Sequence, residues 1–417
     1  MQAIQIQDLH QRLNVERMIK RIEELANCSS TDRGVTRLSF TKESEAASKL
    51  VSEWMRDAGM SVRRDELGNV IGRFEGTQSD APALIIGSHL DSVIEAGKYD
   101  GILGVITGIE IVHTLFENGV RPNCPIEVVG FCDEEGTRFN TALLGSRAMA
   151  GSLRDEDLRA KDDNGVTLAA AMQEMGFDPS RYKLAARKPE MVLGYIELHI
   201  EQGPVLEQMN QSCGVVSGIA GASRYQFRVE GLAGHAGTVP IHMRKDALAV
   251  TSEMILVIEQ IALEYQDIVA TVGKLSVYPG ASTVIPELVE GTLDIRCIDD
   301  KRKQDALNHI IEECQQICRR RGLSCEFHKI MDSPAAVCSG HIINIIKSVL
   351  EDHGMKPVQL VSGAGHDAMA MASITDIGMI FVRCKDGLSH HPDEAVAAED
   401  MKAGASVLLD VTLQLTF

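Results

Sequence analysis

The sequence lacks the long apolar segments that cross a membrane. No run of about 18 apolar residues occurs among its 417 residues, so we expect no transmembrane helix. The first 28 residues are polar and amphipathic and contain no apolar signal core, which gives no reason to expect export. A cytoplasmic location is the expectation that follows.

Positive charge is also in short supply. The chain has 41 Lys and Arg against 59 Asp and Glu, a formal net charge of −18. This excess of acid argues against nucleic acid or an anionic membrane as the main partner, because both are bound through clustered cations. It does not identify a substrate, since many cytosolic enzymes are acidic.

Closely spaced cysteine pairs are missing. Ten cysteines are scattered along the chain and no CxxC pair occurs, which argues against a structural zinc knuckle. This spacing does not suit a disulfide scaffold either, and we expect reduced, mostly buried thiols.

The apolar residues that are present form a clear pattern. Hydrophobic residues make up 44% of a chain whose 417 residues exceed what one core usually holds, so two domains are expected. Three segments have the composition of buried strands and are separated by helical segments: "PALIIGSHLD" (82–91), "PIEVVGFCDEEG" (125–136) and "MVLGYIELHIEQG" (191–203). This alternation predicts the α/β fold class with a largely parallel, mixed sheet.

The pattern changes at Cys213. From there to residue 332 the expected elements follow the order β-α-β-β-α-β, the ferredoxin-like split arrangement, and the α/β alternation then resumes. The sequence therefore predicts a discontinuous catalytic domain, 1–212 and 333–417, with an inserted α+β domain at 213–332. The edge strand and amphipathic helices of the insertion suit a pairing surface.

Polar side chains close each of the three buried strands. The first ends in His89 and Asp91, the second in Asp133, Glu134 and Glu135, and the third in Glu197, His199, Glu201 and Gln202. Ligands of open α/β sheets bind outside the carboxyl ends of the strands. Imidazoles and carboxylates without thiolates suit Zn²⁺ or another first-row ion such as Mn²⁺, and two ions about 3.5–4 Å apart would use this many ligands.

Each motif alone has an ordinary structural explanation. "HLD" also suits a polar pair in the core, "DEEG" a turn, "HIEQG" an exposed strand and "SHH" a solvated loop. Their joint occurrence at the ends of apolar strands favours the metal site. Asp91 lies two residues after His89, so on an extended chain its carboxylate is expected to hold the other ring nitrogen of that histidine.

Eight motifs together resemble a known family. They are "GVTRLSFT", "GSHLDSV…GKYDGILGV", "DEEGTRF", "GSRAMAG", "ELHIEQGPVLE", "GHAGTVP", "SGAGHDA" and "GLSHHPDE". With these the chain resembles, almost end to end, the hydantoinase/carbamoylase amidohydrolases of the dinuclear metallopeptidase (M20) superfamily. The likeness is greatest to N-carbamoyl-L-amino acid hydrolases, with allantoate amidohydrolases as near relatives.

The resemblance implies an activity, cofactors and a site. It implies hydrolysis of an N-carbamoyl C–N bond with two divalent ions, Zn or Mn, in a homodimer. One ion would be held by His89, Asp100 and His199, and the second by Asp100, Glu135 and His390. Glu134 would be the general base, and His235 would also be catalytic. Substrate contacts would come from Gln202, His235, Arg296, Gly365 and His366.

The chain departs from the family pattern at two positions that bear on the site. Thr283 stands in "STVIP" where relatives commonly have Asn, which weakens the transfer of that substrate contact. His391 stands where Asn or Ser is more typical, so His390 rather than His391 is expected to be the ligand.

Three other functions stay open at this point. Allantoate hydrolysis uses the same chemistry, and Arg224 would suit a second polar arm of that substrate, although an exposed strand arginine explains it equally well. A dipeptidase or aminoacylase is disfavoured by His199, since peptidase relatives tend to have a carboxylate there. A catalytically inactive binding protein is disfavoured because every expected ligand is present.

Overall fold

The protein folds into two compact units in a computed structural model that describes residues 6–417. Unit 1 runs up to Gly218 and continues from Val337, and unit 2 is Ile219–Ala336. The predicted insertion starts at Cys213, whereas β6 (Cys213–Ile219) pairs with β15 (Ile377–Val382) in the large sheet of unit 1. The division between the units therefore follows β6.

Unit 1 is built on a mixed sheet that, in the described residues, has nine strands in the order β1-β2-β4-β3-β5-β15-β6-β13, with β14 beside β6. The bounds not yet given are β1 (Ser61–Arg64), β2 (Val70–Phe74), β3 (Ala83–His89), β4 (Ile126–Phe131), β5 (Val192–Ile200), β13 (Ala336–Val337) and β14 (Gln359–Ser362). The central four, β4-β3-β5-β15, are parallel, and β2 and β6 flank them antiparallel. The predicted α/β class with a largely parallel sheet is confirmed.

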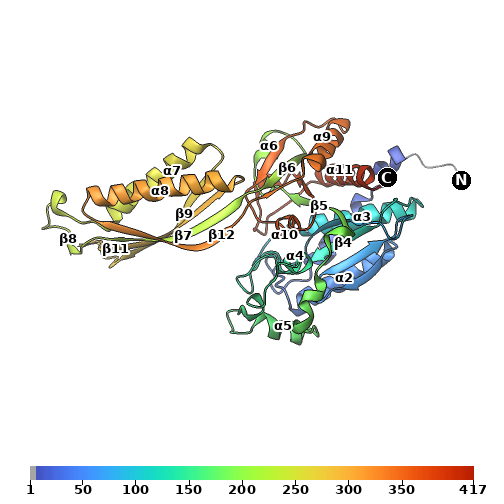
Figure 1. The fold of residues 1–417 in the computed structure, drawn as a ribbon, viewed down its shortest axis with the longest axis horizontal. Helices are drawn as coiled ribbons and strands as arrows, with labels where there is room; N and C mark the ends of the chain where they lie inside the picture. The colour runs from blue at the N-terminus through green and yellow to red at the C-terminus, as the bar shows by residue number, and fades with distance from the viewer. Residues whose placement is uncertain (1–5) are drawn as a thin grey trace. The chain divides into compact units, whose positions relative to one another are not determined.

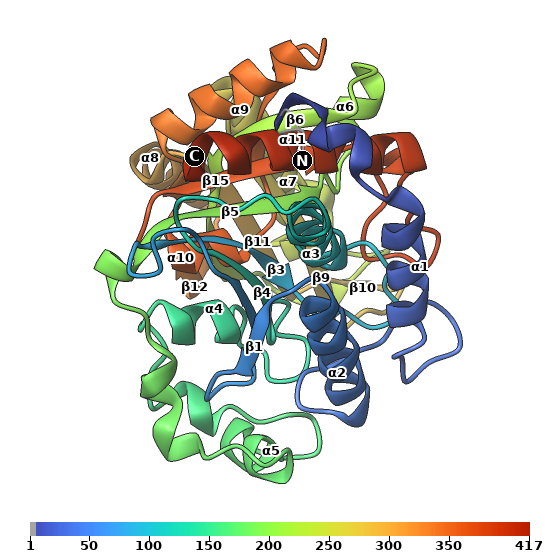
Figure 2. The same cartoon turned by 90° about the vertical axis from the view of Figure 1, so that its right-hand side faces the viewer.

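Helices cover this sheet and bury its central strands. The α-helices of unit 1 are α1 (Val15–Ala26), α2 (Lys42–Asp57), α3 (Ile102–Glu117), α4 (Leu144–Met149), α5 (Leu168–Glu174), α6 (Val205–Gln208), α9 (Gly340–Asp352), α10 (Asp367–Met371) and α11 (Ala398–Thr416). Figure 2 shows α11 and α10 on opposite sides of β5 and β15, and both helices pack on β15. Every residue of β3, β4 and β15 is buried, which explains their continuous apolar runs.

Local sequence signals explain where these helices start. Thr41 caps α2 by accepting the backbone N–H of Ser44, and the Ser44 hydroxyl lies 2.9 Å from the Thr41 backbone nitrogen, completing a capping box. The buried face of α2 then repeats at helical spacing through Ala47, Val51 and Met55.

Unit 2 is a four-stranded antiparallel sheet with two helices on one face. Its strands are β7 (Gly221–Glu230), β9 (Val269–Tyr278), β11 (Leu288–Cys297) and β12 (Ser324–Ser333), in the order β12-β7-β11-β9. The helices α7 (Ala247–Tyr265) and α8 (Asp300–Arg320) lie side by side along it (Figure 1). Tyr225, Phe227 and Val229 alternate into the core beneath these helices.

A short ribbon of β8 (Gly234–His235) and β10 (Val284–Ile285) completes unit 2.

Across residues 6–417, no helix combines the length and the apolar composition that crossing a bilayer requires.

Candidate metal centre

Five side chains with metal-binding groups gather where the parallel strands of unit 1 end. His89 ends β3, Asp100 precedes α3, Glu135 follows β4, His199 lies near the end of β5, and His390 lies in the loop between β15 and α11. Their ligand atoms form two groups within 4.8 Å, His89 with Asp100 and His199, and Asp100 with Glu135 and His390, and a third group joins His89 and Glu135 to Glu134. The structure thus brings together the two sets expected from the sequence, with Asp100 in both.

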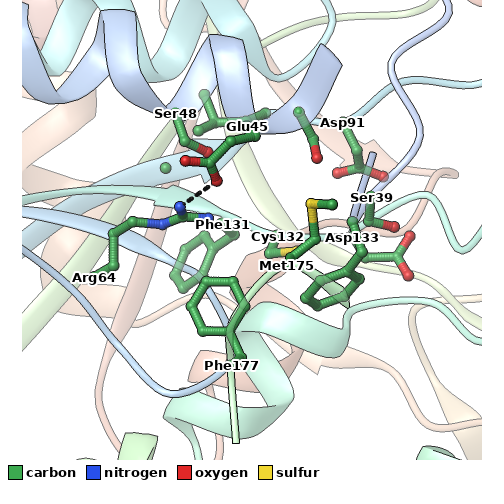
Figure 3. Close-up of a pocket in the computed structure, with 15 residues that line it drawn as sticks. Ser39, Glu45, Ser48, Arg64, Asp91, Phe131, Cys132, Asp133, Met175 and Phe177 are labelled. Atoms are coloured by element: carbon green, nitrogen blue, oxygen red, sulfur yellow. Dashed lines mark hydrogen bonds and ion pairs between the residues drawn. The ribbon is translucent and has the colours of Figure 1, made fainter. Parts of the chain in front are cut away.

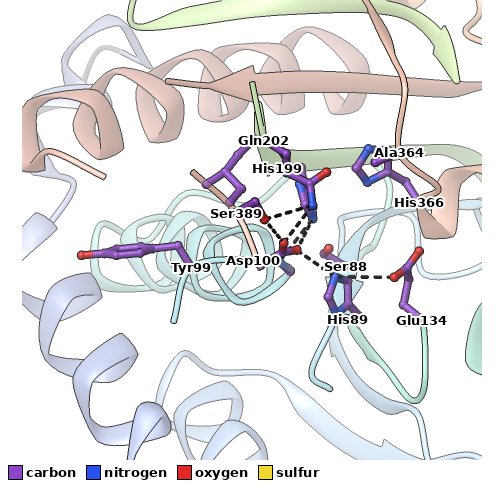
Figure 4. A network of polar contacts seen from close by, with 12 residues as sticks. Ser88, His89, Tyr99, Asp100, Glu134, His199, Gln202, Ala364, His366 and Ser389 are labelled. Carbon is purple, nitrogen blue, oxygen red and sulfur yellow. Dashed lines mark hydrogen bonds and ion pairs between the residues drawn. The ribbon is translucent and has the colours of Figure 1, made fainter. Parts of the chain in front are cut away.

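The two buried histidines point their Nε2 atoms at one carboxylate. The Nδ1 atoms of His89 and His199 lie 3.0 and 2.9 Å from backbone carbonyl oxygens, which only accept hydrogen bonds, so each Nδ1 carries a proton. Their Nε2 atoms lie 3.4 and 3.1 Å from Asp100 Oδ1 (Figure 4). Burial disfavours the charged rings, but Asp100 outweighs it and raises the pKa of both histidines. A cation bound by the two Nε2 atoms would satisfy the same carboxylate in place of protons, so the donor set fits a metal ion.

The group of Asp100, Glu135 and His390 fits a metal ion because it contains buried carboxylate oxygens without hydrogen-bond donors within residues 6–417. Asp100 Oδ1 and Glu135 Oε1 are buried and have no hydrogen-bond partner among the described residues. His390 Nε2 lies 3.5 Å from both Asp100 Oδ2 and Glu135 Oε1. Buried carboxylate oxygens without partners are costly, and a divalent cation supplies the missing counter-charge.

Glu134 stands beside these groups without belonging to the two expected sets. Its carboxylate lies 4.0 Å from His89 Nε2, and the residue is 8% exposed (Figure 4). Burial raises the pKa of Glu134 well above its ordinary value, His89 opposes this rise, and Glu135 adds to it. The side chain is therefore placed to accept or return a proton next to the metal ligands.

A buried carboxylate from one loop holds the backbone of the next. Asp91 Oδ1 and Oδ2 accept the N–H groups of Glu134 and Glu135, at 2.9 and 3.1 Å. The nearest acceptor for His89 Nδ1 is the backbone oxygen of Asp91 at 3.0 Å, while the carboxylate predicted for that task lies 3.5 Å away. The Asp91 carboxylate is thus mainly engaged in fixing the loop after β4.

Sequence reasoning missed two supports of Asp100. Glu394 Oε1 accepts the N–H groups of Tyr99 and Asp100, at 2.9 and 3.1 Å, and the Ser389 hydroxyl donates to Asp100 Oδ2. Both residues lie in "GLSHHPDE", but no local signal shows that this loop reaches residue 100. Gln202 Nε2 donates to the same Asp100 oxygen at 2.8 Å.

Three loops of the site contain non-glycine residues in the left-handed backbone region. Asp133, Gln202 and His390 have φ values of 57°, 57° and 55°. Such conformations cost on the order of 1–3 kcal/mol each and persist where the surroundings fix them. The hydrogen bonds to Asp91 and Asp100 provide such surroundings for two of these loops.

The predicted substrate contacts are divided between the units. In unit 1, the His366 ring lies 4.5 Å from that of His199, and burial together with His199 lowers the pKa of His366 well below its ordinary value. Gly365 is close enough to Glu134 that a Cβ there would lie 3.7 Å from Oε1.

The other two predicted contacts lie in unit 2. His235 is exposed, and its Nδ1 accepts the Gly237 N–H at 3.0 Å. Arg296 Nε donates to Asp294 at 2.7 Å. The part these side chains play in binding substrate stays a prediction.

A cavity lies beside Cys132 and Asp133, at the end of β4 (Figure 3). It has a volume of about 20 Å³ and is lined by Asp91, Cys132, Asp133 and Phe177 among others, with the Arg64–Glu45 ion pair at its edge. That volume accommodates about one water molecule. The cavity is therefore too small to bind an organic substrate.

Comparison with known proteins agrees with this geometry. Residues 85–414 match the model of peptidase family M20/M25/M40. The chain belongs to this family. M20 enzymes depend on metal ions, and the groups around Asp100 offer residues that hold them.

Two curated relatives and one solved structure show what the chain is similar to. The chain is 45% identical to an N-carbamoyl-L-amino-acid amidohydrolase of Pseudomonas sp. (strain NS671), covering 95% of this chain and 97% of that protein. It is 39% identical to the allantoate deiminase of Arabidopsis thaliana, over 97% of this chain and 83% of the relative. The crystal structure of a hydantoinase/carbamoylase family amidase from Burkholderia multivorans superposes with a TM-score of 0.92 at 33% identity, covering 97% and 98% of the two chains.

Proposed function

We propose that this M20 protein hydrolyses the ureido C–N bond of N-carbamoyl-L-amino acids. One water is consumed per substrate, and the products are the L-amino acid, ammonia and carbon dioxide. The observation that carries the reaction type is the cluster of imidazoles and carboxylates around Asp100 at the strand ends. The substrate class rests on the 45% identity with an N-carbamoyl-L-amino-acid amidohydrolase.

The centre would hold two divalent ions, Zn²⁺ or Mn²⁺. His89, Asp100 and His199 would hold one, and Asp100, Glu135 and His390 the other, so that Asp100 is shared. When bound, such ions act as Lewis acids that polarise a carbonyl and lower the pKa of water.

Glu134 would transfer the proton, and Asp91 would hold Glu134 in position. Glu134 accepts a proton from the attacking water and later delivers it to the leaving nitrogen, as a general base and then acid. Asp91 keeps the Glu134 backbone in place through the 2.9 Å hydrogen bond to its N–H. The neighbouring Gly365 leaves room beside the Glu134 carboxylate, since a Cβ at that position would lie 3.7 Å from Oε1.

For substrate recognition we propose the residues that the family resemblance implies. Arg296 would hold the substrate carboxylate, because a guanidinium binds a carboxylate through two parallel hydrogen bonds. His235 would donate to the developing oxyanion, and Gln202 and His366 would contact the ureido group. We also propose that the protein works as a homodimer in the cytoplasm.

Allantoate is the second candidate substrate. It carries a carboxylate and two ureido groups, and the 39% identity with an allantoate deiminase favours it specifically. Arg224 and Arg296 both donate to Asp294, so two guanidinium groups lie together on β7 and β11 and would suit a longer polar substrate.

A side-by-side assay tests the proposal. Purified protein loaded with Mn²⁺ or Zn²⁺ is given N-carbamoyl-L-methionine, allantoate and a dipeptide, and ammonia release is measured. We expect kcat/KM for the carbamoyl amino acid to be at least about tenfold above that for allantoate, with no dipeptide hydrolysis. Chelation should abolish turnover and either ion should restore it. The opposite ratio would assign allantoate, and inactivity on both ureido acids would refute the proposal.

A further inference from the structure

A carboxylate that no ligand set includes lies directly beneath the metal centre. Glu197, on β5, is 0% exposed. The groups within hydrogen-bond distance of its two oxygens are neutral: the Ser88 hydroxyl at 2.8 Å, the Ala368 backbone N–H at 3.0 Å, and the Tyr195 hydroxyl at 3.0 Å, which also lies 2.9 Å from the Gly87 carbonyl oxygen. Burying a carboxylate among neutral groups is expensive, so its presence here calls for a physical reason.

Each of these contacts leads to a segment that carries a histidine of the site. Ser88 is adjacent to His89, and Ala368 lies two residues after His366. Glu197 itself lies two residues before His199 on the same strand, and therefore on the same face of the sheet. One carboxylate thus ties β3, β5 and the start of α10 together.

The three imidazoles are close enough for this tie to matter. The His199 ring centroid lies 5.9 Å from that of His89 and 4.5 Å from that of His366, as Figure 4 illustrates. The segments that carry them are separated by about 100 residues or more of sequence, since the Ser88 contact spans 109 residues and the Ala368 contact 171. Local backbone geometry therefore does not set the distances between the rings.

We propose that Glu197 is a positioning residue that fixes the spacing of His89, His199 and His366. The inference rests on the proposed function, in which the first two bind metal and the third contacts substrate. A carboxylate suits this task because its two oxygens accept several donors at once, and a buried backbone N–H that loses its acceptor is costly.

Two substitutions separate geometry from charge. In Glu197→Gln, the amide oxygen still accepts from Tyr195 and Ala368, and the amide nitrogen faces a Ser88 hydroxyl that accepts as well as donates. In Glu197→Ala, all three acceptor contacts are lost. Rescue by glutamine is therefore expected if Glu197 acts through geometry.

The readouts are Mn²⁺ affinity, measured by competition with a chelator, and the visible absorption spectrum of the Co²⁺-loaded protein. We expect Glu197→Ala to weaken Mn²⁺ binding by about 10–100-fold and to change the Co²⁺ spectrum, because groups that orient metal ligands have effects of this size. Glu197→Gln should stay within about threefold of the parent protein and keep its spectrum.

Glu110 provides the matched control. It is also 0% exposed, but it binds Asn14 and Arg17 rather than a segment of the site. Glu110→Ala should lower the melting temperature while leaving Mn²⁺ affinity and the Co²⁺ spectrum unchanged. An equal effect of Glu110→Ala and Glu197→Ala on metal binding would show that general destabilisation is responsible, and would overturn the proposal.

The remaining outcomes are also decisive. Parent-like affinity and spectrum in Glu197→Ala would refute the positioning role. Should that variant fail to fold, Ser88→Ala removes one contact, and we expect severalfold weaker Mn²⁺ binding with an altered spectrum; no change would refute the role. Both readouts are independent of substrate, so a protein inactive on ureido acids still tests this inference. A parent protein that binds no divalent ion would refute the proposed centre and this inference with it.

Discussion

Unit 1 buries a set of acidic side chains, whereas unit 2 buries none among the described residues. In the part of the chain that the structure describes, every buried Asp and Glu lies in unit 1, and so does every group of metal-ligand type. Acidic residues of unit 2 that form ion pairs stay partly exposed themselves, as Asp294 does beside Arg224 and Arg296. Exposed ion pairs contribute little, while a buried carboxylate requires a metal ion or several donors. The comparison places every group of possible metal ligands among the buried carboxylates of unit 1 and none in unit 2, within the described residues.

The largest test of this comparison is the proton-transferring group of unit 1. Glu134→Gln keeps the size of the side chain but removes its basicity, so kcat should fall on the order of 10³-fold. Glu134 lies in one group of possible ligands, with His89 and Glu135, but in neither of the two expected ligand sets. Metal content, measured by elemental analysis, should therefore stay at the parent level. Retained turnover would show that Glu134 is not the base.

Neighbouring histidines give the next test. His390 lies 3.5 Å from Asp100 and Glu135, whereas His391 Nδ1 faces the exposed Asp393 at 3.8 Å. His390→Ala should weaken metal binding on the order of 100-fold, and His391→Ala should change it by less than about twofold. Chelator titration of both variants measures this, and the reverse order would move the ligand to His391.

The variant Asp91→Asn tests whether a buried carboxylate that is not a metal ligand contributes to catalysis. Asn at this position offers one oxygen to the two N–H groups of Glu134 and Glu135, so one of them loses its acceptor. We expect Asp91→Asn to lower kcat by about 10–100-fold with little change in KM. Steady-state kinetics on the folded variant provide the measurement. A kcat equal to that of the parent protein would show that this buried carboxylate of unit 1 is not needed for catalysis.

The smallest effect is expected in unit 2. Asp294 accepts from Arg224 and Arg296 and is partly exposed, with a side chain 22% accessible. Asp294→Asn should change KM for carboxylate substrates by less than about fivefold and leave kcat and metal affinity unchanged. A loss as large as that expected for Asp91→Asn would break the comparison, because it would place a critical charge in unit 2.

Much of unit 1 was predictable from short stretches of sequence. The apolar runs of β3, β4 and β5 predicted buried parallel strands, and the polar residues that close them predicted where ligands gather. The physical reason is local, because hydrophobic pattern fixes the type of element and parallel strands end at the same edge. The resemblance to a family then singled out Asp100 and His390, which no strand pattern marks.

The sequence by itself determined the elements, the class of sheet and the chemical nature of the ligands. Only the tertiary structure decided which groups support them: the backbone oxygen of Asp91 on His89, Glu394 on the loop of Asp100, and Glu197 beneath the histidines. Glu394 and Asp100 are 294 residues apart, and such a pairing depends on the packing of the whole sheet. Hydrogen bonds between distant segments leave no periodic signal, so they become visible only when the chain is folded.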